Sequence, residues 1–187
     1  MATVINLTPI QGLSRQKFRQ VCEANPDLFL ERSAAGDLVI VSPVGGEGGN
    51  QEANLITDLT LWNRQTGLGV VFSSSTIFSL PEGGDRGPDA AWVKKDRWES
   101  LSQAEREGFP PLCPDFVIEL RSRADRLSLL QAKMLEYQAN GLRLGWLINP
   151  QQRQVEIYRQ DQPVAVVLLP AQLSGEAVLP GLILYLE

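Results

Sequence analysis

The sequence contains no histidine among its 187 residues. This absence excludes Ser-His-Asp triads, histidine general bases and HExxH zinc sites. Any metal site must therefore be built from carboxylates and carbonyl oxygens. These are the ligands that hard cations such as Mg²⁺ and Mn²⁺ prefer.

Cysteines are scarce and long apolar runs are missing. Cys22 and Cys113 lie far apart and form no CxxC pair, so we expect two reduced thiols in a cytoplasmic protein. No apolar stretch approaches the ~18–20 residues of a membrane span. The N-terminus also lacks the basic and apolar regions of a signal peptide. We therefore expect no membrane association.

An excess of positive charge is lacking as well. The chain has 17 Lys and Arg against 22 Asp and Glu, which gives a net charge of −5. Such a chain is not expected to bind nucleic acid strongly through non-specific electrostatics. A local basic cleft stays compatible with this total, because active-site carboxylates themselves lower the net charge.

The remaining pattern alternates between helical and extended periodicity. With 43% hydrophobic residues, the chain can form one core, and no repeat or linker interrupts it. We predict one α/β domain over residues 1–187, with a loop at 81–87. Predicted helices cover 13–24, 47–65, 96–107 and 125–140. Predicted strands cover 28–31, 37–41, 70–72, 76–80, 88–93, 116–120, 144–148, 155–158, 165–169 and 181–186.

An acidic residue interrupts one of the most apolar predicted strands. Glu119 lies in a run that contains Phe116, Val117, Ile118 and Leu120. A carboxylate in such a run is costly unless it is paired, protonated or bound to a cation. The residues opposite Glu119 are therefore the first candidates for function.

Asp89 is the best partner for Glu119. It opens a predicted strand 30 residues earlier, directly after Pro88, and acids on neighbouring strands can approach within about 5 Å. Such a pair would hold one divalent cation and activate a water for attack on phosphorus. Asp115 would lie about 13 Å from Glu119 along one strand, so we interpret it as a strand-start residue.

Lys133 follows on the predicted helix 125–140. Helical spacing places it on one flank of the apolar stripe and Gln131 on the other. From there Lys133 can lean over the carboxylates and stabilise charge at a phosphate. Alternatively, it can extend its stem along the edge of the core. Spacing alone leaves both roles open.

Several motifs in order resemble one family. Residues 42–47 read SPVGGE and residues 88–93 read PDAAWV. They are followed by 114–125, then Lys133, Met134 and Tyr137, and finally 141–150. This series resembles the Uma-two type restriction endonuclease family over nearly the whole chain. The Pro-Asp and Glu-Leu-Arg elements are also similar to the PD-(D/E)XK nuclease motif, with its final Lys replaced by Arg.

The resemblance implies a restriction-endonuclease-like fold, in which a central mixed β-sheet is flanked by α-helices. It also implies that Asp89 and Glu119 are ligands of Mg²⁺ or Mn²⁺. An acid on the first core helix would join them, and Glu47 is the first choice here. Glu52 is the second choice, because it falls deeper in the helix. Equally, Glu47 can be an N-terminal acid stabilised by the helix dipole.

The position of the missing lysine is occupied by Arg121. Arginine stays protonated and cannot act as a general base, although it can bind phosphate. Lys133 resembles a lysine that has migrated to the helix in other branches of the superfamily. The expected catalytic set is therefore Asp89, Glu119, Lys133 and Arg121.

These expectations describe a Mg²⁺-dependent endonuclease that hydrolyses DNA. A homodimer is expected by family analogy, since a two-fold dimer cuts both strands most simply. RNA or branched DNA stays open as the substrate. The acidic composition and the replaced lysine also leave open a catalytically inactive nuclease-fold module that binds nucleic acid or protein.

Overall fold

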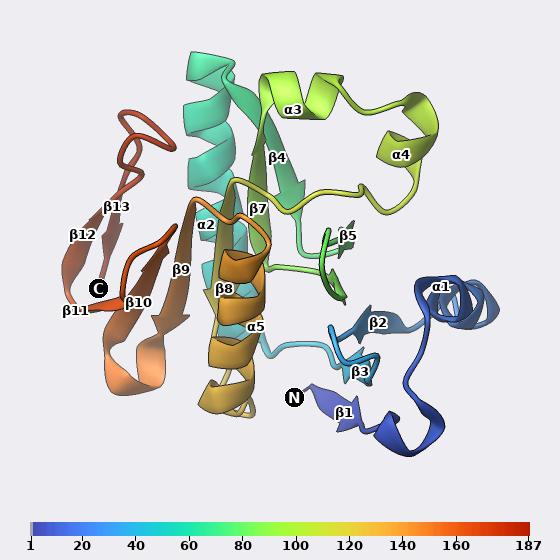
Figure 1. Ribbon diagram of the computed structural model, residues 1–187. Coiled ribbons are helices and arrows are strands. Elements are labelled where there is room, and N and C mark those ends of the chain that lie inside the picture. The colour runs from blue at the N-terminus through green and yellow to red at the C-terminus, as the bar shows by residue number, and fades with distance from the viewer. Residues whose placement is uncertain (1) are drawn as a thin grey trace.

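A six-stranded mixed sheet forms the centre of the computed structural model, which describes residues 2–187 (Figure 1). The strand order is β11-β10-β9-β8-β7-β4, and only β8 and β9 pair in parallel. The strands are β4 (Gly69–Ser73), β7 (Ala90–Lys94), β8 (Phe116–Leu120), β9 (Leu144–Asn149), β10 (Gln154–Arg159) and β11 (Ala165–Leu168). Helix α5 (Leu127–Ala139) connects the parallel pair, as a crossover requires.

The two longest helices cover opposite faces of this sheet (Figure 1). Helix α2 (Gly46–Thr66) ends at Gly67, whose φ of 65° favours glycine. It packs Leu59 and Trp62 on the face that carries Trp92, Phe116 and Trp146. The other face carries the side chains of Ala91, Val117 and Leu147, which lie in one cluster with Met134 and Tyr137 of α5. Alternation along β7 and β8 therefore assigns even-numbered residues to α2 and odd-numbered residues to α5.

A smaller sheet from the N-terminal half lies beside the central one (Figure 1). Its order is β1-β3-β2-β6-β5, and helix α1 (Arg15–Ala24) begins after the N-cap Ser14, within the range 13–24 predicted for it. The strands are β1 (Thr3–Ile5), β2 (Phe29–Arg32), β3 (Leu38–Val41), β5 (Phe78–Ser79) and β6 (Asp85–Arg86), and a 3₁₀ turn, η1, covers Thr8–Ile10.

Two predictions of local structure were wrong. The loop predicted at 81–87 contains β6, because Arg32 pairs with Asp85 through the backbone and through a buried ion pair of 2.7 Å. The helix predicted at 96–107 is two helices, α3 (Lys95–Glu99) and α4 (Gln103–Glu107). Ser102 starts the second one through a capping box with Glu105.

The C-terminal part adds a turn and a short hairpin. Residues Pro150–Gln152 form the 3₁₀ turn η2, while β12 (Ala171–Ser174) pairs with β13 (Ile183–Leu186). The sequence pattern predicted β13 but not β12 or β1. Among the helices of residues 2–187, none combines the length and the apolarity needed to cross a membrane.

Candidate active site

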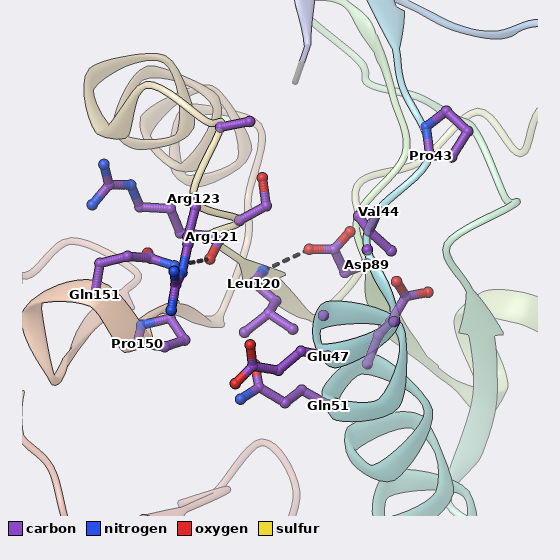
Figure 2. Close-up of a pocket in the computed structure, with 16 residues that line it drawn as sticks. Pro43, Val44, Glu47, Gln51, Asp89, Leu120, Arg121, Arg123, Pro150 and Gln151 are labelled. Carbon is purple, nitrogen blue, oxygen red and sulfur yellow. Dashed lines mark hydrogen bonds between the residues drawn. The ribbon is translucent and has the colours of Figure 1, made fainter.

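Asp89 and Glu119 lie close together where β7 begins and β8 ends. Asp89 directly precedes β7, whose first residue, Ala90, pairs with Ile118 of β8, the residue before Glu119. Ala90 and Ile118 pack toward α2, and alternation along β8 therefore turns Glu119 toward α5. The Asp89 carboxylate also accepts a hydrogen bond of 2.6 Å from the backbone N–H of Leu120 (Figure 2). Both acids line a single cleft of about 740 Å³.

Lys133 reaches this pair from α5. Its ammonium lies 2.8 Å from Oε1 of Glu119, and the Tyr137 hydroxyl donates to the same oxygen at 3.2 Å. Lys133 and Tyr137 are four residues apart, so they occupy one face of the helix. Helical spacing left two arrangements open for Lys133, over the carboxylates or along the edge of the core. The structure shows the first, with the ammonium against Glu119.

A third carboxylate at this site was missed in the sequence. Oε1 of Glu31, on β2, lies 2.8 Å from the Lys133 ammonium, which also donates to the Gly87 carbonyl at 2.8 Å. Glu31 is 2% exposed. It follows the apolar run of Leu28, Phe29 and Leu30, the same kind of signal that identified Glu119. The criterion applied to Glu119 would have found Glu31 too.

Burial is the main influence on the two acids of the cleft. Burial raises the pKa of Glu119 to about 8; Lys133 opposes this shift, while Asp89 and Glu31 reinforce it. Burial likewise raises the pKa of Asp89 to about 6, against the effects of Lys133 and the Leu120 N–H, and Glu52 adds to the rise. Burial thus disfavours the ionised forms of both acids in spite of Lys133, and a divalent cation would favour those forms.

The other charges of the cluster stay ionised. Burial acts to raise the pKa of Glu31, but Lys133 and Arg86 together hold it below its ordinary value. Burial acts to lower the pKa of Lys133, but Glu119, Glu31 and Asp89 outweigh it and the pKa rises. The amine is therefore protonated at neutral pH and cannot serve as a base in this arrangement.

The donor set fits a hard cation with two protein carboxylates. Within residues 2–187, no three His, Cys, Asp or Glu side chains are grouped closely enough to hold a metal ion. Asp89 and Glu119 would be the ligands, and waters would complete the shell, as is common for Mg²⁺. The physical reason for the fit is that a bound cation would stabilise the ionised forms of these two buried acids, which burial disfavours.

The candidates on α2 occupy different places. Glu47 is exposed and, with Gln51, extends from the first turns of α2 along an adjoining cavity that Asp89 also lines (Figure 2). Glu52 lines both cavities, and its charge contributes to the raised pKa of Asp89. Glu47 as a ligand stays a prediction, and electrostatics favours Glu52 over it.

Arg121 does not take the place of the missing lysine. Strand β8 ends at Leu120, so the alternation that would align residue 121 with Glu119 stops there. The Arg121 guanidinium donates to Oδ1 of Asn149 at 3.1 Å and to the Asp125 carbonyl at 3.3 Å. Gln131 is also directed elsewhere, with a hydrogen bond of 2.8 Å to Glu156. Among the side chains of Arg121, Gln131 and Lys133, the one that contacts Glu119 is that of Lys133.

Asp115 lies at the opposite end of β8 and has a structural role, as expected. It is buried, accepts the Lys94 N–H at 2.9 Å and pairs with Arg97 at 2.9 Å. Arg143 approaches the same carboxylate at 3.6 Å. These contacts anchor the start of β8, away from Glu119.

Comparison with known proteins gives two positive findings. The family Uma2, described as "Putative restriction endonuclease", matches residues 15–187. The structure is similar to a crystal structure described as "a putative nuclease belonging to DUF820" from Anabaena variabilis ATCC 29413. The TM-score is 0.72 at 18% identity, over 83% of this chain and 86% of that chain. No curated protein matched. The fold is thus restriction-endonuclease-like, as predicted.

Proposed function

The chain belongs to the Uma2 family, and from this premise we propose that it is a Mg²⁺- or Mn²⁺-dependent endonuclease that hydrolyses phosphodiester bonds of DNA. The observation that carries the proposal is the grouping of Asp89, Glu119 and Lys133 in one cleft. Two desolvated carboxylates beside one ammonium form an incomplete charge balance, which a divalent cation and a phosphate would complete.

Each side chain has a definable role in this proposal. Asp89 and Glu119 would hold the cation, which when bound supplies Lewis-acid stabilisation of charge on the phosphate. The Leu120 N–H orients the Asp89 carboxylate, and the Tyr137 hydroxyl orients that of Glu119. The Lys133 ammonium would stabilise, through its charge, the negative charge that develops in the transition state.

The direct test is cleavage of supercoiled plasmid by the purified protein. We expect nicked and linear DNA with Mg²⁺ or Mn²⁺ and intact plasmid with EDTA. Parallel reactions with RNA and with branched DNA identify the preferred substrate. A folded sample that binds the cation but cleaves none of these substrates would contradict the proposal and favour the inactive binding module.

Arg123 is the best candidate for a phosphate contact. It is exposed and lines the cavity that Asp89 and Arg121 share (Figure 2), whereas Arg121 is engaged by Asn149. We expect Arg123→Ala to raise KM several-fold with little change in kcat. The slope of log affinity against log salt should fall by about 1, since each phosphate contact releases about one counterion.

The matched control is Arg106→Ala on α4, an exposed arginine outside both cavities. Binding titrations at several salt concentrations should leave its slope at the parental value. An unchanged slope for Arg123→Ala would show that this arginine makes no phosphate contact.

A further inference from the structure

The Lys133 ammonium is held by three acceptors from three different segments. These are Glu119 on β8, Glu31 on β2 and the carbonyl of Gly87, each at 2.8 Å. An ammonium group has three N–H donors, so all of them are used. A lysine side chain is long and flexible, and fixing it costs rotamer entropy. A single ion pair with Glu119 would leave much of this freedom.

Glu31 is itself fixed by its surroundings. Its Oε1 accepts the Gly87 N–H at 3.1 Å, and its Oε2 lies 3.2 Å from Arg86. Arg86 is held in turn by Glu136 at 2.6 Å. Gly87 therefore donates to Glu31 through its N–H and accepts from Lys133 through its carbonyl. This peptide segment leads directly into Asp89, so Glu31 connects the lysine with the strand entry that carries the first acid.

We propose that Glu31 is a positioning residue that holds the Lys133 ammonium against Glu119, so that the N-terminal sheet completes the active site. This inference rests on the proposed nuclease function for its kinetic consequence, but not for its geometry. Glu31 acts through Lys133. The long, flexible lysine stem from α5 needs this second carboxylate, because Glu119 alone does not immobilise it.

The kinetic test is Glu31→Gln, which preserves shape and removes the charge. We expect kcat to fall about 10–100-fold with KM within about twofold of the parent, the usual cost of losing a supporting contact. The matched control is Glu156→Gln. Glu156 is also buried, but it contacts Gln131 and Tyr158. This control variant should retain parental kcat.

A double-mutant comparison separates positioning from a general structural effect. In a Lys133→Met background, Glu31→Gln should lower kcat no further, because its effect passes through the missing amine. If the two substitutions lower kcat multiplicatively in the double variant, the proposal is overturned. Equal losses of kcat in Glu31→Gln and Glu156→Gln would also overturn it.

A readout without activity tests the geometry directly. Acetic anhydride labelling followed by mass spectrometry should show slow modification of Lys133 in the parent, because its donors are engaged. The labelling rate should rise at least several-fold in Glu31→Gln and stay unchanged in Glu156→Gln. Unchanged labelling in Glu31→Gln would refute the positioning role. If labelling behaves as expected but the parent cleaves no substrate, only the nuclease proposal fails.

Discussion

Replacing Asp89 by Asn, or Glu119 by Gln, is expected to lower metal-dependent cleavage by on the order of 10³-fold or more. Each substitution removes one of the two charges that would hold the cation, whose contribution of several kcal/mol to the transition state corresponds to a factor of this size. The shape of the site should persist, since the asparagine amide keeps an oxygen to accept the Leu120 N–H. Initial rates of plasmid nicking at saturating Mn²⁺ measure the effect.

Two surface substitutions of the same chemistry serve as controls. Asp58→Asn on α2 and Glu107→Gln on α4 change exposed acids that lie outside the cleft, and both should cleave at the parental rate. Circular dichroism should show folded protein in all four variants. If both cleft variants keep more than about a tenth of the parental rate, Asp89 and Glu119 do not take part in the reaction.

The stability of the metal-free protein is expected to fall as the pH rises from about 5 to 8. The pKa of Glu119 in the folded protein is about 8, against an ordinary value of 4.5. Between these values the folded protein holds a proton that the unfolded chain has released. Raising the pH therefore favours unfolding. Asp89 contributes in the same direction up to its pKa of about 6. The combined loss should be on the order of a few kcal/mol.

Mn²⁺ should reverse this trend. The cation binds the ionised carboxylates, so its stabilising effect should be larger at pH 8 than at pH 5.5. Urea denaturation at both pH values, with EDTA or with Mn²⁺, measures the four free energies of unfolding. Glu119→Gln should be more stable than the parent at pH 8 in EDTA, with a shallower pH dependence and little response to Mn²⁺.

The difference between the parent and Glu119→Gln in the pH dependence of the free energy of unfolding separates the contribution of Glu119 from that of every other titrating group. If the parent is more stable at pH 8 than at pH 5.5 in EDTA, the raised pKa values are wrong. If Glu119→Gln keeps the full pH dependence, Glu119 is not its source. Either result would also weaken the case for a cation at this carboxylate pair.

Much of the fold could be predicted from local sequence pattern. Ser14 marked the start of α1, Gly67 marked the end of α2, and the apolar run at 116–120 marked β8. These signals lie within a few residues of the structure that they predict. Strand β6 could not be found in this way, because the partners of Asp85 are Arg32 and Ser79 in other segments. Its local composition is that of a loop.

The cluster around Lys133 shows the same limit at the site. Periodicity placed Lys133 beside the apolar stripe, yet its ammonium also contacts Glu31, which precedes it by 102 residues. Arg121 shows the converse. Its place two residues after Glu119 suggests a shared face, but β8 ends at Leu120 and Asn149 engages the guanidinium. Short-range alternation holds only while the strand continues.

Local sequence pattern predicted one α/β domain, and the motif series, through its family resemblance, implied the restriction-endonuclease-like fold. Pattern also singled out Glu119 and suggested Asp89 as its partner. A carboxylate in an apolar strand is unusual enough to be recognised without coordinates. Long-range packing decided which cationic side chain meets these acids and which further carboxylate holds it. Those contacts join β2, β8, α5 and the segment before β7 through the single ammonium of Lys133.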